Sequence, residues 1–275
     1  MGRITNFLGS PKTIAATTAQ TIVWTGNELP SQGLVAIHFA TTGGANNSLA
    51  NCMANRLRIK ADSTTIFDVS LTAYQSWLQR FSQANLSPGN AVLAWSVWFN
   101  MLDIVDDDLA DACQFPRGTV PTVELNTNAS VAAGSAYIGW TVSDVEADYY
   151  PVLIGQAMNF AAPGAGTTEN LSFPITEPGM LRGFAMPTVG LSRLRLDLSG
   201  AQYEYLPGAL YQGTATGDMF RDAQAIEDNQ SVTTTIWHRL YGTQAGLGAS
   251  RVELAVGTTW GGVANEITTW AVRPQ

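Results

Sequence analysis

The stretch that decides the fold is RLRIKADSTTIFDV, at residues 56–69. Polar and apolar side chains alternate over Arg56–Lys60, and a period of two predicts a strand with one buried face and one exposed face. A short turn follows, and Ile66–Val69 continues as a second strand. A similar order returns later, where SRLRLDLSGAQYEYL at residues 192–206 again gives an alternating strand, a turn and a second strand.

An internal repeat extends this likeness across the whole chain. Segments of the first half recur in the second half, in the same order and at nearly constant spacing. The matches are Asn55–Ile59 with Ser192–Leu196, Val97–Trp98 with Ile236–Trp237, Val123–Leu125 with Val252–Leu254, Trp140–Val142 with Trp270–Val272 and, more weakly, Leu34–Gly43 with Leu181–Gly190. The first copy holds extra residues after Gly43 and after Trp98, and insertions of this kind belong in surface loops. We infer a true duplication.

Each copy is predicted to be mainly β. Segments rich in valine, tryptophan and threonine fit a half-buried pleated surface; they are Ala91–Phe99, Val131–Val142, Val232–Trp237 and Asn265–Val272. Apolar residues at helical spacing after a capping serine predict one helix over Ser70–Phe81, with a weaker counterpart at Asp218–Ile226. Two such units in tandem favour a pair of β-sandwiches over an α/β enzyme.

Proline and glycine place the boundary between the copies after Val142. The stretch 143–178 holds four prolines and several glycines, as linkers do. We therefore expect an N-terminal arm at 1–21, a first domain at 22–142, a linker at 143–178 and a second domain at 179–275. Residues Met1–Pro11 include three apolar side chains and are expected to be a mobile part of the arm.

The chain is poor in charge for its size. Its 275 residues carry 22 acidic and 14 basic side chains, so 13% are charged against a usual value of about 25%. A monomer of this mass should expose about 11,500 Å², which leaves roughly one charge per 320 Å². This surface suits a protein that is covered by neighbours. The net charge of −8 excludes a basic, non-specific nucleic-acid binder, and the hydrophobic content of 45% excludes a disordered chain.

The sequence lacks the patterns of a membrane-spanning helix, a secretory signal and a disulfide framework. No apolar run reaches the roughly 18 residues that a membrane-spanning helix needs, and the N-terminal residues lack a secretory signal pattern. Cys52 and Cys113 do not make a disulfide framework. We expect synthesis in a reducing cytosol, with both cysteines as small buried residues.

Histidine and aspartate are the first candidates for chemistry. His38 and His238 lie on predicted strands at positions that are not equivalent in the repeat, and neither has a nucleophile motif nearby, so a structural role is favoured. Five aspartates cluster in Asp103–Asp111, where hard cations such as calcium could bind between subunits. The spacing does not match an EF-hand, and a solvated acidic loop is the favoured reading.

For the remaining motifs, a structural role is favoured over a role in binding or catalysis. Gly164–Gly166 lacks the residues that complete a phosphate-binding loop. Glu124 and Glu253 occupy equivalent repeat positions, which indicates a structural role for both. A sugar-stacking platform could use the tryptophans, but the pairs Trp98/Trp237 and Trp140/Trp270 recur in both copies, which favours packing between sheets. The sequence predicts no catalytic residue, cofactor or metal ligand.

The order of elements resembles the double jelly-roll major capsid proteins of tailless icosahedral phages with an internal membrane, a lineage shared with adenovirus. The corticovirus-type coat protein is the nearest likeness. The resemblance rests on the polar lead Met1–Thr21, the strand Arg56–Asp62 that turns into Ile66–Val69 and then into the helix Ser70–Phe81, the similar order in Leu194–Leu206, and two halves of near-equal length.

The resemblance implies an all-β fold of two tandem eight-stranded jelly rolls, related by duplication, with a short helix in each. It further implies a capsid subunit without enzymatic activity. Three subunits would form a pseudo-hexagonal trimer that contacts neighbouring capsomers, vertex and minor capsid proteins and, through the arm, the viral membrane, without sequence-specific nucleic-acid binding. The virion would be its location. The alternatives are a tandem β-sandwich spike module that binds or cleaves glycans, and a minor capsid or vertex protein.

Overall fold

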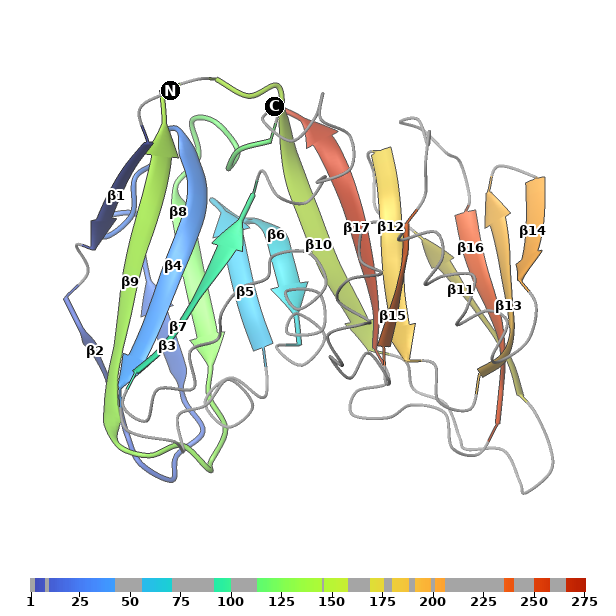
Figure 1. Ribbon diagram of the computed structural model, residues 1–275, viewed down its shortest axis with the longest axis horizontal. Helices are drawn as coiled ribbons and strands as arrows, with labels where there is room; N and C mark the ends of the chain where they lie inside the picture. Colours follow the sequence, from blue (N-terminus) through green and yellow to red (C-terminus); the bar gives the residue numbers. More distant parts are fainter. Residues whose placement is uncertain are drawn as a thin grey trace, which may run out of the picture. The chain divides into compact units, whose positions relative to one another are not determined.

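A computed structural model (Figure 1) describes residues 3–7, 10–42, 56–70, 92–99, 113–144, 146–157, 169–175, 180–187, 191–198, 201–205, 235–239, 250–257 and 266–275. These residues form strands and turns, and none of them belongs to a helix long and apolar enough to cross a membrane. The predicted helix over Ser70–Phe81, beyond Ser70 itself, and its counterpart at Asp218–Ile226 lie outside the described residues. The chain divides into two compact units, Met1–Ile154 with Val272–Gln275, and Gly155–Ala271.

The first roll is built from the strands β1 (Arg3–Phe7), β2 (Lys12–Ile14), β3 (Thr21–Trp24), β4 (Leu34–Thr42), β5 (Arg56–Ala61), β6 (Thr64–Val69), β7 (Val92–Trp98), β8 (Pro121–Asn126) and β9 (Gly134–Ser143). One sheet has the order β1-β9-β4-β7, with β2 also paired to β9, and the facing sheet contains β3-β8-β5-β6. If β2 is set aside and the others are numbered along the chain, these orders are 1-8-3-6 and 2-7-4-5. This is the strand order of a jelly roll.

The second roll repeats this arrangement. Its strands are β10 (Tyr149–Ala157), β11 (Glu169–Ile175), β12 (Met180–Pro187), β13 (Leu191–Leu198), β14 (Ala201–Tyr205), β15 (Thr235–Arg239), β16 (Ser250–Val256) and β17 (Glu266–Pro274). They pair in the orders β10-β17-β12-β15 and β11-β16-β13-β14, which are again 1-8-3-6 and 2-7-4-5. The prediction of two tandem eight-stranded jelly rolls is therefore confirmed.

Strands also occupy the stretches that composition assigned to an arm and a linker. β1 and β2 lie within residues 1–21, and β10 and β11 lie within 143–178. The two stretches thus contain the opening strands of the two rolls. In 143–178 the prolines explain the difference from the expectation, because proline usually marks a break. Pro174 lies in β11, an edge strand, where a missing N–H is tolerated.

The core of the first unit lies between its two sheets. Trp24 of β3 contacts Phe39 of β4 edge to face, with ring centroids 6.0 Å apart. Phe67 of β6 contacts Phe99, which directly follows β7, at 5.7 Å. These rings are fully buried or nearly so. Each aromatic pair joins one sheet to the other. Edge-to-face contacts of this kind stabilise the folded state by more than the burial of their apolar area alone.

Two of the matched tryptophans confirm the prediction of core packing. Trp140 of β9 and Trp270 of β17 are both buried, and they occupy the last strand of each roll. Cys113 is also buried, as expected. The side chains of Trp98 and Trp237 are not among those described, nor are Trp77 and Cys52.

Candidate functional site

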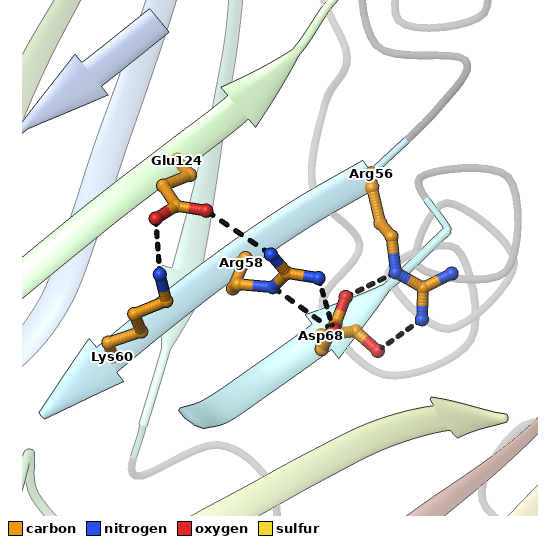
Figure 2. A network of polar contacts seen from close by, with 5 residues as sticks. All are labelled: Arg56, Arg58, Lys60, Asp68 and Glu124. Atoms are coloured by element: carbon orange, nitrogen blue, oxygen red, sulfur yellow. Dashed lines mark hydrogen bonds and ion pairs between the residues drawn. The ribbon is translucent and has the colours of Figure 1, made fainter. Parts of the chain in front are cut away.

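The clearest polar arrangement of the first unit lies on the solvent-side face of β5, β6 and β8 (Figure 2). Alternation along β5 buries Leu57 and Ile59 and leaves Arg56, Arg58 and Lys60 half-buried on the opposite face. Arg58 stands directly opposite Asp68 of β6 and Glu124 of β8. We call these five charged residues, Arg56, Arg58, Lys60, Asp68 and Glu124, the charged ladder.

Arg58 is the centre of the charged ladder. Its Nη2 donates to Oδ2 of Asp68 at 2.9 Å, its Nε donates to the same oxygen at 3.1 Å, and its Nη1 reaches Oε2 of Glu124 at 3.4 Å. The hydrogen bond to Asp68 is the main reason that the pKa of Arg58 is raised. One guanidinium therefore joins two carboxylates across three strands, because its several N–H donors point in different directions.

Two further cations complete the charged ladder. Arg56 donates through Nε to Oδ1 of Asp68, and through Nη2 to the backbone oxygen of Asp68 at 3.0 Å. Lys60 donates to Oε1 of Glu124. Each carboxylate is thus held by two basic groups, and the whole carries three positive and two negative charges. Each carboxylate accepts hydrogen bonds from basic groups on a neighbouring strand, so the arrangement favours a structural role that joins the three strands.

The second roll carries the same row in the same register. Arg195 of β13 stands opposite Glu204 of β14 and Glu253 of β16. The flanking leucines also correspond, since Leu57 is opposite Leu125 and Leu194 is opposite Leu254. An acid–base–acid row therefore recurs in both rolls. The equivalence that the repeat predicted for Glu124 and Glu253 is confirmed.

One cross-strand pair of the row carries different charges in the two rolls. Lys60 stands opposite Thr122 in the first roll, whereas Asp197 stands opposite Arg251 in the second. The two sets of positions hold six of the 14 basic residues of the chain, namely Arg56, Arg58, Lys60, Arg193, Arg195 and Arg251. Scarce charge is thus concentrated on one sheet of each roll. Sequence reasoning missed this arrangement, although the repeated Arg-Leu-Arg motif and the repeated glutamate were its signals.

His38 lies on the other sheet of the first unit. Its Nδ1 is 2.7 Å from Oγ of Ser96 on β7, and its Nε2 is 2.7 Å from Oγ1 of Thr141 on β9. Burial lowers the pKa of His38. Hydroxyl groups can donate or accept, so they satisfy either neutral tautomer. Both ring nitrogens of His38 thus contact hydroxyl groups on neighbouring strands, which fits the structural role that the sequence predicted.

Of the other candidates from the sequence, His238 lies within the described residues, whereas the acidic cluster and the glycine loop do not. His238 lies on β15, opposite Phe184 of β12; it occupies the sixth strand of its roll, whereas His38 occupies the third. The acidic cluster Asp103–Asp111 and the Gly164–Gly166 loop lie outside the described residues. Within the described part of the chain, no group of three or more histidine, cysteine, aspartate or glutamate side chains could hold a metal ion.

Comparison with solved structures gives likenesses over the full length. The chain matches the major capsid protein P2 of bacteriophage PM2 with a TM-score of 0.68 at 12% identity, covering 100% of this chain and 98% of that one. The STIV major capsid protein matches with a TM-score of 0.65 at 12% identity, over 99% and 96% of the two chains. A PBCV-1 capsid structure matches with a TM-score of 0.55 at 8% identity, over 99% and 93%.

These likenesses agree with the strand order in both rolls and show the fold of the chain as a double jelly roll. No family model matches the sequence, and no curated protein matches it.

Proposed function

We propose that this chain is the major capsid protein of an icosahedral virus and that its activity is self-assembly, not catalysis. The observation that carries the proposal is the jelly-roll strand order found twice in one chain. Full-length likeness to capsid proteins of three viruses supports it, because the match covers almost all of this chain and of each of those chains.

The proposed assembly depends on which surfaces of a roll are apolar and buried and which remain outside. In the first unit, apolar faces meet between the sheets, while the charged ladder lies on the opposite face of one sheet. The charge of the whole chain is low, at 13% of residues. A surface of this kind is costly to leave in water and suits burial against neighbours. An obligate interface would cover about 2,000 Å² or more.

In this proposal three copies form a trimer with six rolls. The trimers contact one another in the shell, and vertex and minor capsid proteins contact them at special positions. The mature location is the virion, after synthesis in the host cytoplasm. Of the predicted arm, Arg3–Phe7 forms β1, and contact of the arm with the viral membrane stays a prediction.

The native mass of the purified protein tests this proposal. Light scattering should give three times the chain mass of 29.4 kDa at micromolar concentration. The same measurement with a calcium chelator tests Asp103–Asp111, since loss of the trimer would indicate a bridging cation. A monomer at all concentrations would contradict the proposal, and glycan-binding screens would then test the spike-module alternative.

A further inference from the structure

The first roll has one sheet edge that is covered. Strand β6 is the fifth strand of this roll, and its inner neighbour is β5. On its other side it pairs in parallel with the first half of β10, through Leu153 with Phe67 and Ile154 with Asp68. All four residues belong to the first compact unit. Strand β10 is also the first strand of the second roll. The fifth strand of one roll, β6, is therefore paired here with the first strand of the other, β10.

The same two strand positions occur once more in the chain, and there each has a single neighbour among the strands that the structure describes. The fifth strand of the second roll is β14, and among the described residues it pairs with β13 alone. The first strand of the first roll is β1, and within the described part of the chain it pairs with β9 alone. Figure 1 shows β14 beside β13 and β1 beside β9. Among the described residues, the second roll thus has a fifth strand with one paired side, and the first roll has a first strand with one paired side.

We propose that β14 of one copy pairs in parallel with β1 of a second copy, as β6 pairs with β10 within the chain. This inference rests on the proposed function and deepens it, because it names the strands through which copies join. The duplication supplies the argument: Tyr203 and Glu204 occupy the register positions of Phe67 and Asp68. Those are the two residues of β6 that pair with β10.

The lengths and energetics of the two edges agree with this pairing. Both β1 and β14 are five residues long. An exposed edge presents unpaired N–H and C=O groups that template another strand, and natural proteins cover such edges or make them unattractive. The contact joins two different surfaces, so it is heterologous, and heterologous contacts close into rings when the rotation permits. Three copies would close a ring of six rolls with no open edge of this kind.

Engineered disulfides test the pairing directly. Cys52→Ser and Cys113→Ala first give a cysteine-free background, whose native mass and circular dichroism must match the parent. One variant then carries Gln202→Cys in β14, and a second set carries a single cysteine at each position of Arg3–Phe7 in β1. Each of these is co-expressed with the Gln202→Cys chain and oxidised. A covalent dimer in the mixture joins two chains by construction.

The matched control places the cysteine on another edge. Thr21→Cys is exposed and lies in β3, an edge strand of the first unit that the proposal does not use. We expect at least one β1 position to give about tenfold more covalent dimer with Gln202→Cys than Thr21→Cys does, because neighbouring strands meet the distance that a disulfide requires. A chain with both cysteines should give a covalent trimer.

The outcomes separate the pairing from the proposed function. Native trimers without cross-linking from any β1 position above the Thr21→Cys level would overturn the pairing and leave the capsid proposal standing. A monomer would overturn both.

Hydrogen exchange on the unmodified protein tests the same strand pairing without any substitution. Amides of Ala201–Tyr205 and Arg3–Phe7 should exchange more slowly in the trimer than in chains dissociated by dilution, because pairing protects edge amides. Equal exchange in the two states would contradict the pairing.

Discussion

The sheet β3-β8-β5-β6 of the first roll and the sheet β11-β16-β13-β14 of the second are two versions of one structure. The strands pair in the same order, and arginine stands between two acidic residues in both, at Arg58 and at Arg195. They differ at the edge, since β6 pairs with β10 while β14 pairs, among the described residues, with β13 alone. They also differ where Lys60 is replaced by Asp197.

The strand order and the central arginine are shared by the two sheets, so we attribute them to the requirements of folding a roll. The edge pairing differs, so we attribute it to the different surroundings of each roll. The arginine joins three strands in the first roll, and Arg195 occupies the same register position in the second. The edge strand has different surroundings in the two rolls, and its difference points to contacts outside the roll. A duplicated chain can thus be read as an internal comparison in which shared features report on folding.

Removal of the largest core side chain of this sheet should have the largest effect. Trp24 is fully buried and stands opposite Val123, while Phe173 stands opposite Val252 in the second roll. Trp24→Ala should destabilise the first unit by about 3–5 kcal/mol because a large cavity remains. Trp24→Phe, which installs the residue of the second roll, should cost much less. Urea denaturation measures both, and equal losses would contradict the equivalence of the two sheets.

Removal of the central arginine should have an intermediate effect. Arg58→Ala leaves Asp68 and Glu124 with one cation each on a half-buried face. We expect a loss of about 1–2 kcal/mol in the free energy of unfolding, since charged hydrogen bonds are lost while solvent screens the remainder. Arg58→Lys keeps the charge and should lose less. Arg195→Ala should act similarly in the second roll, and a neutral result at both sites would remove the structural role of the row.

An exchange of charges tests the one cross-strand pair whose charges differ between the two rows. Lys60→Asp alone places a third carboxylate beside Glu124 and should cost about 0.5–1 kcal/mol, the usual size of a cross-strand pair. Adding Thr122→Arg recreates the Asp197–Arg251 arrangement and should restore most of the loss. A double-mutant cycle measures this coupling, and strict additivity of the two changes would show that the registers are not interchangeable.

The smallest expected effect concerns the histidine that only the first roll carries at this place. His38 pairs in register with Ser96, whereas the second roll has Pro187 opposite Thr235. Burial lowers the pKa of His38 in the folded state, so the unfolded chain binds a proton more readily. Stability should therefore fall as the pH drops below about 6.5, the ordinary histidine value.

A substitution assigns that pH dependence to one residue. His38→Gln keeps a polar side chain without the titration, and it should flatten the stability profile between about pH 5 and pH 7. A slope unchanged by His38→Gln would contradict the assignment.

The sequence predicted the fold well because alternation and repetition are local signals. The alternating stretch around Arg58 and its copy around Arg195 identified paired strands and the duplication. The opening strands of the rolls were not predicted, because Pro151 and Pro174 made β10 and β11 resemble a linker. The charged ladder was also missed, since Asp68 and Glu124 meet Arg58 only through pairing across strands that are far apart in sequence. The acidic cluster Asp103–Asp111 stays a prediction.

The most direct test of the account is a cryo-electron microscopy reconstruction of the purified assembly. The account predicts three chains around a three-fold axis, six jelly rolls in a ring, and a continuous sheet in which β14 of each chain lies beside β1 of the next. A trimer whose β14 and β1 edges face solvent would contradict the edge pairing. A monomeric particle, or an assembly held by other surfaces without a ring of six rolls, would contradict the proposal that this double jelly roll is a capsid subunit.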